Sequence, residues 1–120
     1  MWTYEQKTGK LHAPDGSLAG TGWAGQQEGY NNPDMQDVAG IGPLPRGLYT
    51  ISKAYKHPHL GPVTMNLQPD PANQMFGRSL FRFHGASSSA PELSSHGCII
   101  MPRTVRDVIA ASADRTLLVV

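Results

Sequence analysis

Cysteine, charge of one sign and long apolar runs are all scarce in this sequence of 120 residues. The single cysteine, Cys98, excludes a framework of disulfides within the chain. The formal net charge is only +1 and the Lys and Arg residues are scattered, so no nucleic-acid partner is expected. No apolar run approaches the roughly 18 residues that a membrane span needs. These absences leave one expected domain, residues 1–120, folded around a hydrophobic core.

An export signal is also lacking at the start of the sequence. Residues 1–10, MWTYEQKTGK, contain no basic stretch followed by an apolar core, which a secretory signal peptide requires. We therefore expect the protein to be made in the reducing cytoplasm, with which the lack of disulfides agrees. Another route must deliver it if it acts outside that compartment.

The 13 glycines and 10 prolines lie between short apolar runs, a spacing typical of turns that join strands. The turn residues PDG, at 14–16, predict a hairpin within residues 10–20. Period-two alternation predicts strands over residues 49–55 and 63–68. Residues 21–47 show many breakers and little periodicity, so we expect a long surface loop, which in a small domain is commonly functional.

The segment SLFRFHG predicts a third strand, in which Phe81 and Phe83 point to one face. Leu80, Arg82 and His84 then point to the opposite face. If the two rings fill the core, His84 faces a cleft or solvent.

The C-terminal part of the chain predicts the one helix and a last strand. Val105, Val108 and Ile109 form an apolar stripe at helical spacing within residues 102–113. The apolar run at 115–120 predicts a buried strand. The fold class is therefore mainly β, with one short helix after the cysteine.

The residues most able to carry chemistry are His84 and Cys98. A cysteine attacks as a thiolate, and a nearby imidazole can take its proton and later protonate a leaving amine. Gly97 allows a sharp turn before the sulfur, where backbone N–H groups can stabilise an oxyanion. Each residue alone also has a plain structural interpretation, as a buried small side chain or a hydrogen-bonded histidine.

The motif His84-Gly85 followed by Ser95-His96-Gly97-Cys98 resembles the signature of the L,D-transpeptidase catalytic domain. The segment GPLPRGLYTI, residues 42–51, resembles the strand entry of the same superfamily. Nearly the whole chain is similar to the type VI secretion L,D-transpeptidase effectors, toxins that attack peptidoglycan in competing bacteria. The resemblance implies a compact L,D-transpeptidase-like β-sandwich or barrel.

The resemblance also assigns roles at the matching positions. It implies that Cys98 is the nucleophile, His84 the general base, and the Gly85 carbonyl the third member. It further implies an oxyanion hole made by the N–H groups of Gly97 and Cys98, with His96 as a further contributor.

One position departs from the superfamily pattern, and this leaves the binding of the substrate carboxylate open. Many L,D-transpeptidases have Arg two residues after the cysteine, where this chain has Ile100. Arg78 and Arg103 are alternative clamps, and Ser95 and His59 complete the expected substrate-binding set.

The implied reaction is an attack of Cys98 on the meso-diaminopimelate carbonyl of a stem tetrapeptide, with release of D-Ala. Water would resolve the thioester in an L,D-carboxypeptidase, and an amine or a D-amino acid would resolve it in a transpeptidase. No metal or cofactor is expected. The implied partners are peptidoglycan stem peptides, the type VI secretion machinery and a cognate immunity protein, with action in the target-cell periplasm.

Three alternatives compete with this interpretation. A zinc hydrolase would draw ligands from its histidines and Cys98, but the sequence has neither H-E-x-x-H nor C-x-x-C. A sortase-like transpeptidase also places His before Cys, although its segment before the cysteine differs from Ser-His-Gly. A non-catalytic cell-wall binding module would keep the fold without the reaction.

Overall fold

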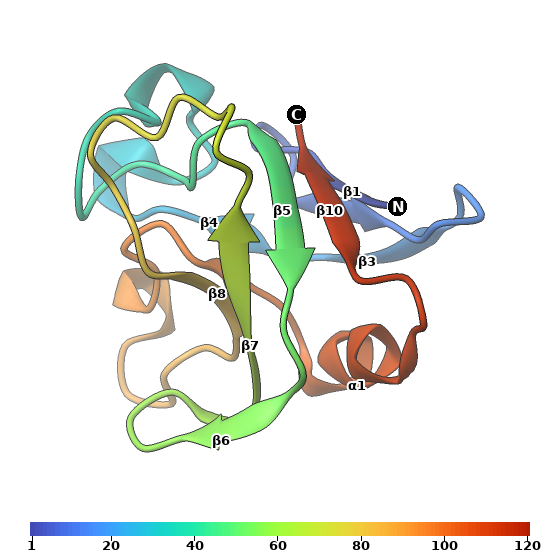
Figure 1. Ribbon diagram of the computed structural model, residues 1–120. Coiled ribbons are helices and arrows are strands. Elements are labelled where there is room, and N and C mark those ends of the chain that lie inside the picture. Colours follow the sequence, from blue (N-terminus) through green and yellow to red (C-terminus); the bar gives the residue numbers. More distant parts are fainter.

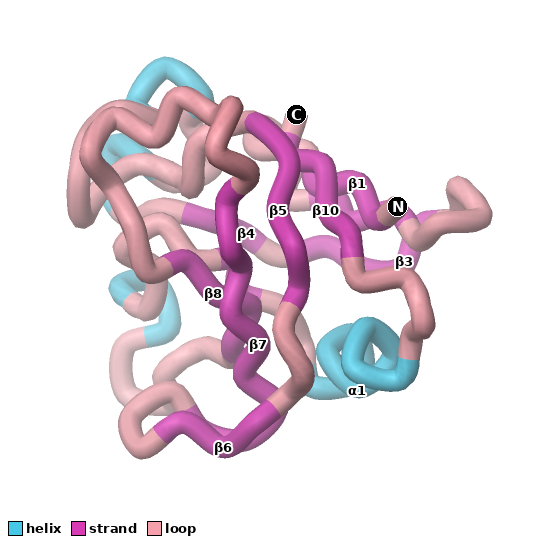
Figure 2. Tube along the Cα trace, viewed as in Figure 1, coloured by secondary structure: helices cyan, strands magenta, loops and turns pink.

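The computed structural model describes all residues 1–120, and its regular secondary structure is mostly strand, joined by long loops (Figures 1 and 2). One α-helix, α1 (Arg103–Ala111), and three single turns of 3-10 helix, η1 (Gln27–Gly29), η2 (Pro33–Met35) and η3 (Pro91–Leu93), lie outside the sheet. The strands are β1 (Trp2–Tyr4), β2 (Lys10–His12), β3 (Leu18–Thr21), β4 (Trp23–Ala24), β5 (Gly47–Ile51), β6 (Tyr55–His57), β7 (Gly61–Pro69), β8 (Phe81–His84), β9 (Ile99–Ile100) and β10 (Thr116–Val119).

The strands join in the order β3-β2-β1-β10-β5-β7-β8-β9-β4, and β6 pairs with β7 beside this path. The sheet curls into a nearly closed barrel, with α1 at the end where β6 also lies (Figure 1). Two pairs, β1 with β10 and β8 with β9, are parallel, and the others are antiparallel. The predicted mainly β fold with one short helix is confirmed.

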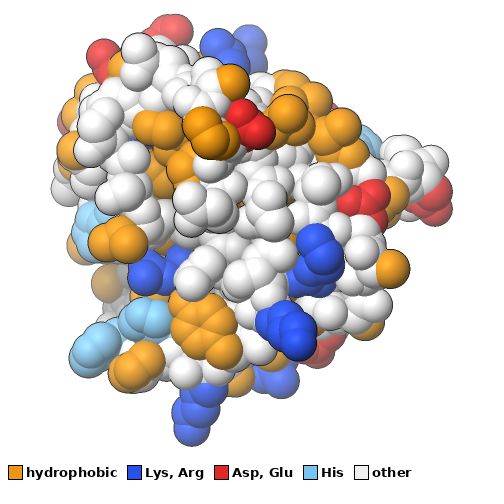
Figure 3. Space-filling view, in the orientation of Figure 1, with side chains coloured by type: hydrophobic (Ala, Val, Ile, Leu, Met, Phe, Trp, Pro, Cys, Tyr) orange, Lys and Arg blue, Asp and Glu red, His pale blue; other side chains and the backbone are white.

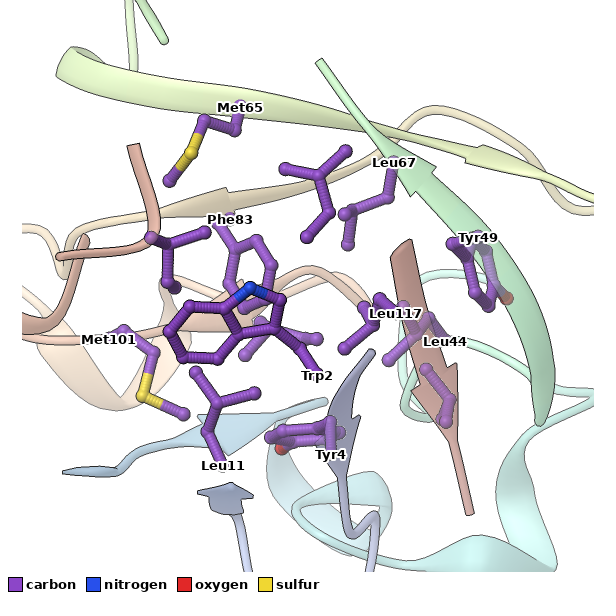
Figure 4. Close-up of a cluster of buried hydrophobic side chains, with 14 of the residues drawn as sticks. Trp2, Tyr4, Leu11, Leu44, Tyr49, Met65, Leu67, Phe83, Met101 and Leu117 are labelled. Carbon is purple, nitrogen blue, oxygen red and sulfur yellow. The ribbon is translucent and has the colours of Figure 1, made fainter. Parts of the chain in front are cut away.

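The core fills the inside of this curled sheet, with Trp2 among the side chains at its centre (Figure 4). Phe81 and Phe83 belong to it, so the predicted inward face of β8 is confirmed. From α1, Val105 and Ile109 pack into the core. Burial of these apolar side chains is the main favourable contribution to folding.

Several strand predictions are confirmed by the observed elements. The hairpin of residues 10–20 is β2 paired with β3, and residues 63–68 lie within β7. The apolar C-terminal run forms β10, with alternating burial. None of the helices has both the length and the apolar character needed to cross a bilayer.

Three details differ from the sequence prediction. The predicted loop at 21–47 contains the two-residue strand β4, which is too short to show a period. The strand predicted over 49–55 is interrupted after Ile51, and β6 begins at Tyr55. On α1 the predicted stripe is incomplete, because Val108 is 58% exposed.

Candidate active site

The pairing register brings the two predicted catalytic residues to one face of the sheet. In the parallel pair of β8 and β9, Phe83 lies beside Ile99 and His84 beside Ile100. One step earlier in the same register, Cys98 lies beside Arg82. Because side chains alternate along a strand and Phe83 points into the core, Arg82, His84 and Cys98 share the outer face.

His84 is held in one orientation by the residue that follows it. Its side chain is only 3% exposed, and its Nδ1 lies 2.8 Å from the Gly85 carbonyl oxygen. A carbonyl can only accept, so Nδ1 carries the hydrogen and Nε2 is left to take a proton. This hydrogen bond joins the two residues predicted as base and third member, and their catalytic roles stay a prediction.

A small cavity of about 110 Å³ opens beside His84. It is lined by His59 and Leu60 from the turn between β6 and β7, and by Ser87 and Ser94 from the loop before Cys98. The structure thus brings His59 to the same cavity as His84. In Figure 3, histidine side chains lie mainly at the left of the face shown, with a Lys or Arg side chain beside them.

Cys98 is half-buried and unpaired, with its Sγ 3.8 Å from the Leu80 carbonyl oxygen. Burial raises the pKa of its thiol, while the backbone N–H of Arg82 and the charges of Arg82 and Arg78 act in the opposite direction. For His84, burial lowers the pKa, and the positive charges of Arg106 and Arg82 add to this effect.

Both pKa shifts favour the uncharged partners over a thiolate–imidazolium pair. At neutral pH the proton therefore rests on sulfur and the imidazole is free to accept it. This is the starting state that general-base catalysis needs.

Ser95 lies beneath the loop that carries the cysteine, with an exposed fraction of 0%. Its hydroxyl accepts hydrogen bonds from the Gly25 and Gly97 N–H groups at 2.8 and 3.1 Å and donates one to the Cys98 carbonyl at 2.6 Å. The hydroxyl predicted to contact substrate is thus occupied by backbone groups.

The N–H groups predicted for an oxyanion hole differ in their availability. The Gly97 N–H is used by Ser95, whereas the N–H groups of His96 and Cys98 have no acceptor within the protein. The Cys98 N–H also lies close enough to its own sulfur to lower the pKa of the thiol. It is the N–H best placed to meet an oxyanion.

Gly97 could not be another residue without rearrangement. Its φ is 128°, and a Cβ at this position would lie 2.6 Å from Nη2 of Arg78 and 2.7 Å from a ring carbon of Phe81. The glycine therefore lets the loop pass close over this arginine and this ring.

Arg78 fastens the same loop to a distant segment. Its guanidinium donates to the carbonyls of Gln36, Pro43, Gly42 and His96 at 2.6 to 3.2 Å, and it lies over the Phe81 ring. The side chain is only 8% exposed, so little of it is open to a ligand. Its predicted carboxylate-binding role stays a prediction.

Arg103 lies elsewhere, at the start of α1. It is exposed, and its Nε donates to Asp107 at 3.0 Å. It lines a separate hollow of about 320 Å³ with Trp23 and Gly85. Its role in substrate binding also stays a prediction.

Sequence reasoning missed Arg82 as a site residue. The alternation in Phe-Arg-Phe-His already placed it on the face of His84, but nothing local showed that Cys98 would lie beside it. Only the parallel pairing of β8 and β9 brings the two together.

The metal-ligand set of a zinc hydrolase is not assembled in this fold. No group of three or more His, Cys, Asp or Glu side chains lies close enough together to hold a metal ion. His57 and His59 lie beside each other, and His59 and His84 line one cavity, but they do not form a set of three metal ligands.

A family model described as the Tlde1 domain matches residues 19–118. The match includes every residue of the site described above and leaves β1 and β2 outside it. No curated protein and no solved structure gives a match.

Proposed function

Because the chain belongs to the Tlde1 domain family of type VI secretion L,D-transpeptidase effectors, we propose that it is an acyl-transfer enzyme acting on peptidoglycan stem peptides. Cys98 is the nucleophile and His84 the general base. The observation that carries this proposal is the His84 Nδ1–Gly85 hydrogen bond, which leaves Nε2 as proton acceptor on the face shared with Cys98.

In the first step His84 Nε2 takes the thiol proton while Sγ attacks the carbonyl at the L-centre of meso-diaminopimelate. The new S–C bond pushes the carbonyl electrons onto oxygen. The Cys98 N–H donates to that oxyanion, and the unpaired His96 N–H is the second available donor.

In the second step the oxyanion collapses and the C–N bond to D-Ala breaks. The imidazolium of His84 gives its proton to the departing nitrogen, and a thioester remains on Cys98. Water or an amine then attacks the thioester, His84 takes the proton of the attacking group, and the thiol is restored.

The choice between water and an amine decides whether the product is a tripeptide or an exchanged peptide. Both products come from the same acyl-enzyme, so we propose a shared carboxypeptidase and transpeptidase activity. The partition between them is set by how well an acceptor amine competes with water for the thioester.

The test is mass spectrometry of tetrapeptide muropeptides incubated with the purified protein, with and without an added D-amino acid. The wild type should release D-Ala, and it should form an exchanged product when the amino acid is present. Cys98→Ala and His84→Ala should abolish both. His12→Ala, in β2 and away from the site, is the matched control. Full release by Cys98→Ala would discard the proposal.

We also propose that the enzyme acts in the periplasm of a target cell and is neutralised by a cognate immunity protein. The type VI effector family supports delivery into target cells and a peptidoglycan target. Directing the chain to the periplasm of a host bacterium should cause lysis, and Cys98→Ala should not. Equal harm from an untargeted cytoplasmic form would contradict this proposal.

A further inference from the structure

We propose that Arg82 binds the carboxylate of the departing D-amino acid and so selects donors that end in a free D-centre. This inference rests on the proposed function and names the group that replaces the arginine expected two residues after the cysteine. That position is Ile100, which is only 2% exposed and uncharged.

Arg82 is placed beside the sulfur by the sheet itself. In register it lies opposite Cys98 on the neighbouring strand, on the outer face, and neighbouring strands are about 4.8 Å apart. The carboxylate carbon of an amino acid lies about 2.5 Å from its nitrogen. A carboxylate on the leaving group therefore falls within reach of a side chain as long as arginine.

The guanidinium of Arg82 is only partly used by the protein. Its Nε donates to Asn66 Oδ1 at 3.1 Å and its Nη1 to the Leu80 carbonyl at 3.3 Å. Both acceptors are uncharged, and no salt bridge in the chain includes Arg82. Of five N–H donors, several stay free to bind a carboxylate in the paired geometry that arginine favours.

A hollow of about 230 Å³ lies against this guanidinium. Arg82, Asn66, Gln68, Ser79 and Leu80 line part of it. Leu80 is 74% exposed and has a φ of 66°, so its backbone turns the side chain out toward solvent, while its carbonyl contacts Sγ of Cys98. Leu80 thus lines the hollow and also contacts the sulfur, and the hollow combines a cation with apolar surface, which suits a small amino acid.

The two arginines predicted from the sequence, Arg78 and Arg103, are less able to bind this carboxylate. The guanidinium of Arg78 donates hydrogen bonds to four backbone carbonyls, and Arg103 is paired with Asp107. The charge of Arg82 also lowers the pKa of both Cys98 and His84. The field of this one guanidinium therefore reaches both reacting groups.

The test compares two donors, a stem tetrapeptide with a free terminal carboxylate and the same peptide with that carboxylate amidated. The measured quantity is kcat/KM for release of the terminal residue. The wild type should prefer the free carboxylate by about ten- to a hundredfold, the effect of a hydrogen-bonded charge pair. Arg82→Gln should process both donors slowly and about equally, and Arg82→Lys should keep part of the preference. Arg46→Gln, at an exposed arginine away from the site, is the matched control and should keep all of it.

The outcomes separate this inference from the proposed function. A wild type that releases the terminal residue equally well from both donors, as D-Ala from one and as its amide from the other, overturns the inference, whether or not any variant folds, and leaves the proposed function intact. A preference that survives in folded Arg82→Gln does the same. If the folded wild type releases no terminal residue from either donor, the proposed function is wrong.

Discussion

At the residue scale, the Ser95 hydroxyl is the point on which the cysteine-bearing loop depends. One oxygen satisfies three buried or half-buried backbone groups, from Gly25 in one segment and from Gly97 and Cys98 in the loop itself. The side chain is completely covered, so bulk water does not compete for these hydrogen bonds. The position of the sulfur is therefore fixed by a residue that contacts no solvent.

We predict that Ser95→Ala lowers the free energy of unfolding by about 2–4 kcal/mol, because buried N–H and C=O groups lose their partner. It should also lower kcat about a hundredfold, since small displacements of a reacting group have effects of that size. Urea unfolding and D-Ala release measure the two effects. Ser88→Ala, exposed and without side-chain hydrogen bonds, should change neither. Wild-type stability and activity in Ser95→Ala would contradict the anchoring role.

The lowered pKa of His84 gives a second residue-scale prediction, on the pH dependence of activity. The base must be uncharged, so activity is present above its pKa and is lost as the pH falls through it. Burial and the nearby arginines lower this pKa, so the acid limb of kcat/KM should lie below the ordinary histidine value of about 6.5. Arg82→Gln removes one positive charge and should move the limb upward. A wild-type acid limb at or above the ordinary value would show that another group controls this limb.

At the scale of elements, α1 shows how a helix closes one end of the barrel with only part of its apolar stripe. Val105 and Ile109 enter the core, whereas Val108 points to solvent. Arg106 lies on the buried side of α1, and its guanidinium donates to the carbonyls of Met101 and Pro62 at 3.0 and 2.8 Å. The helix is thus tied both to the core and to the start of β7.

The unequal burial predicts unequal effects of truncating neighbouring side chains. Ile109→Ala should lower the free energy of unfolding by about 2–5 kcal/mol, since it leaves a cavity in the core. Val108→Ala should change it by no more than about 0.5 kcal/mol, because its side chain is largely in water. Urea unfolding curves of both variants measure the difference. Equal losses would mean that the helix is seated with another face inward.

The elements predicted from the sequence are those that show a period, a turn signal or an apolar run. Residues 63–67 and 81–84 alternate clearly and form β7 and β8, and the apolar stripe of residues 105–109 marks α1. The strand β4 has two residues and no period, yet it pairs with β9, and the Gly25 N–H just after it binds Ser95. Short strands of this kind are defined by their partners, which local sequence does not reveal.

At the scale of the whole molecule, the site is assembled from segments that only the curled sheet brings together. The motif around His84 and Cys98 predicted the family from sequence, and the family is confirmed. The place of Arg82 beside the sulfur and the fastening of the loop by Arg78 depend on pairings between distant segments. Contacts of this kind carry no local pattern, so they become visible only in three dimensions.

Pairing between distant segments also joins the first strand of the chain to the last. β1 and β10 run parallel side by side, with Trp2 in register with Leu117 and Thr3 with Leu118. β10 in turn pairs with β5, so β1 and β2 extend the sheet beyond the part matched by the family model. Trp2 also donates from its indole nitrogen to the Asp114 carbonyl at 3.1 Å. The first strand is therefore part of the core and not an appendage.

We predict that Trp2→Ala lowers the free energy of unfolding by about 3–5 kcal/mol, because the indole lies at the centre of the core and is 2% exposed (Figure 4). Domains of this size have about 5–15 kcal/mol in all, so a large part of the stability would be lost. Thr3→Ala, on the same strand but half-buried, should cost no more than about 1 kcal/mol. Urea unfolding of both variants, followed by D-Ala release below their transitions, measures stability and site integrity separately. If Trp2→Ala unfolds with the midpoint of Thr3→Ala, the first strand does not contribute to the core, and the sheet must be closed by the segments that the family model covers.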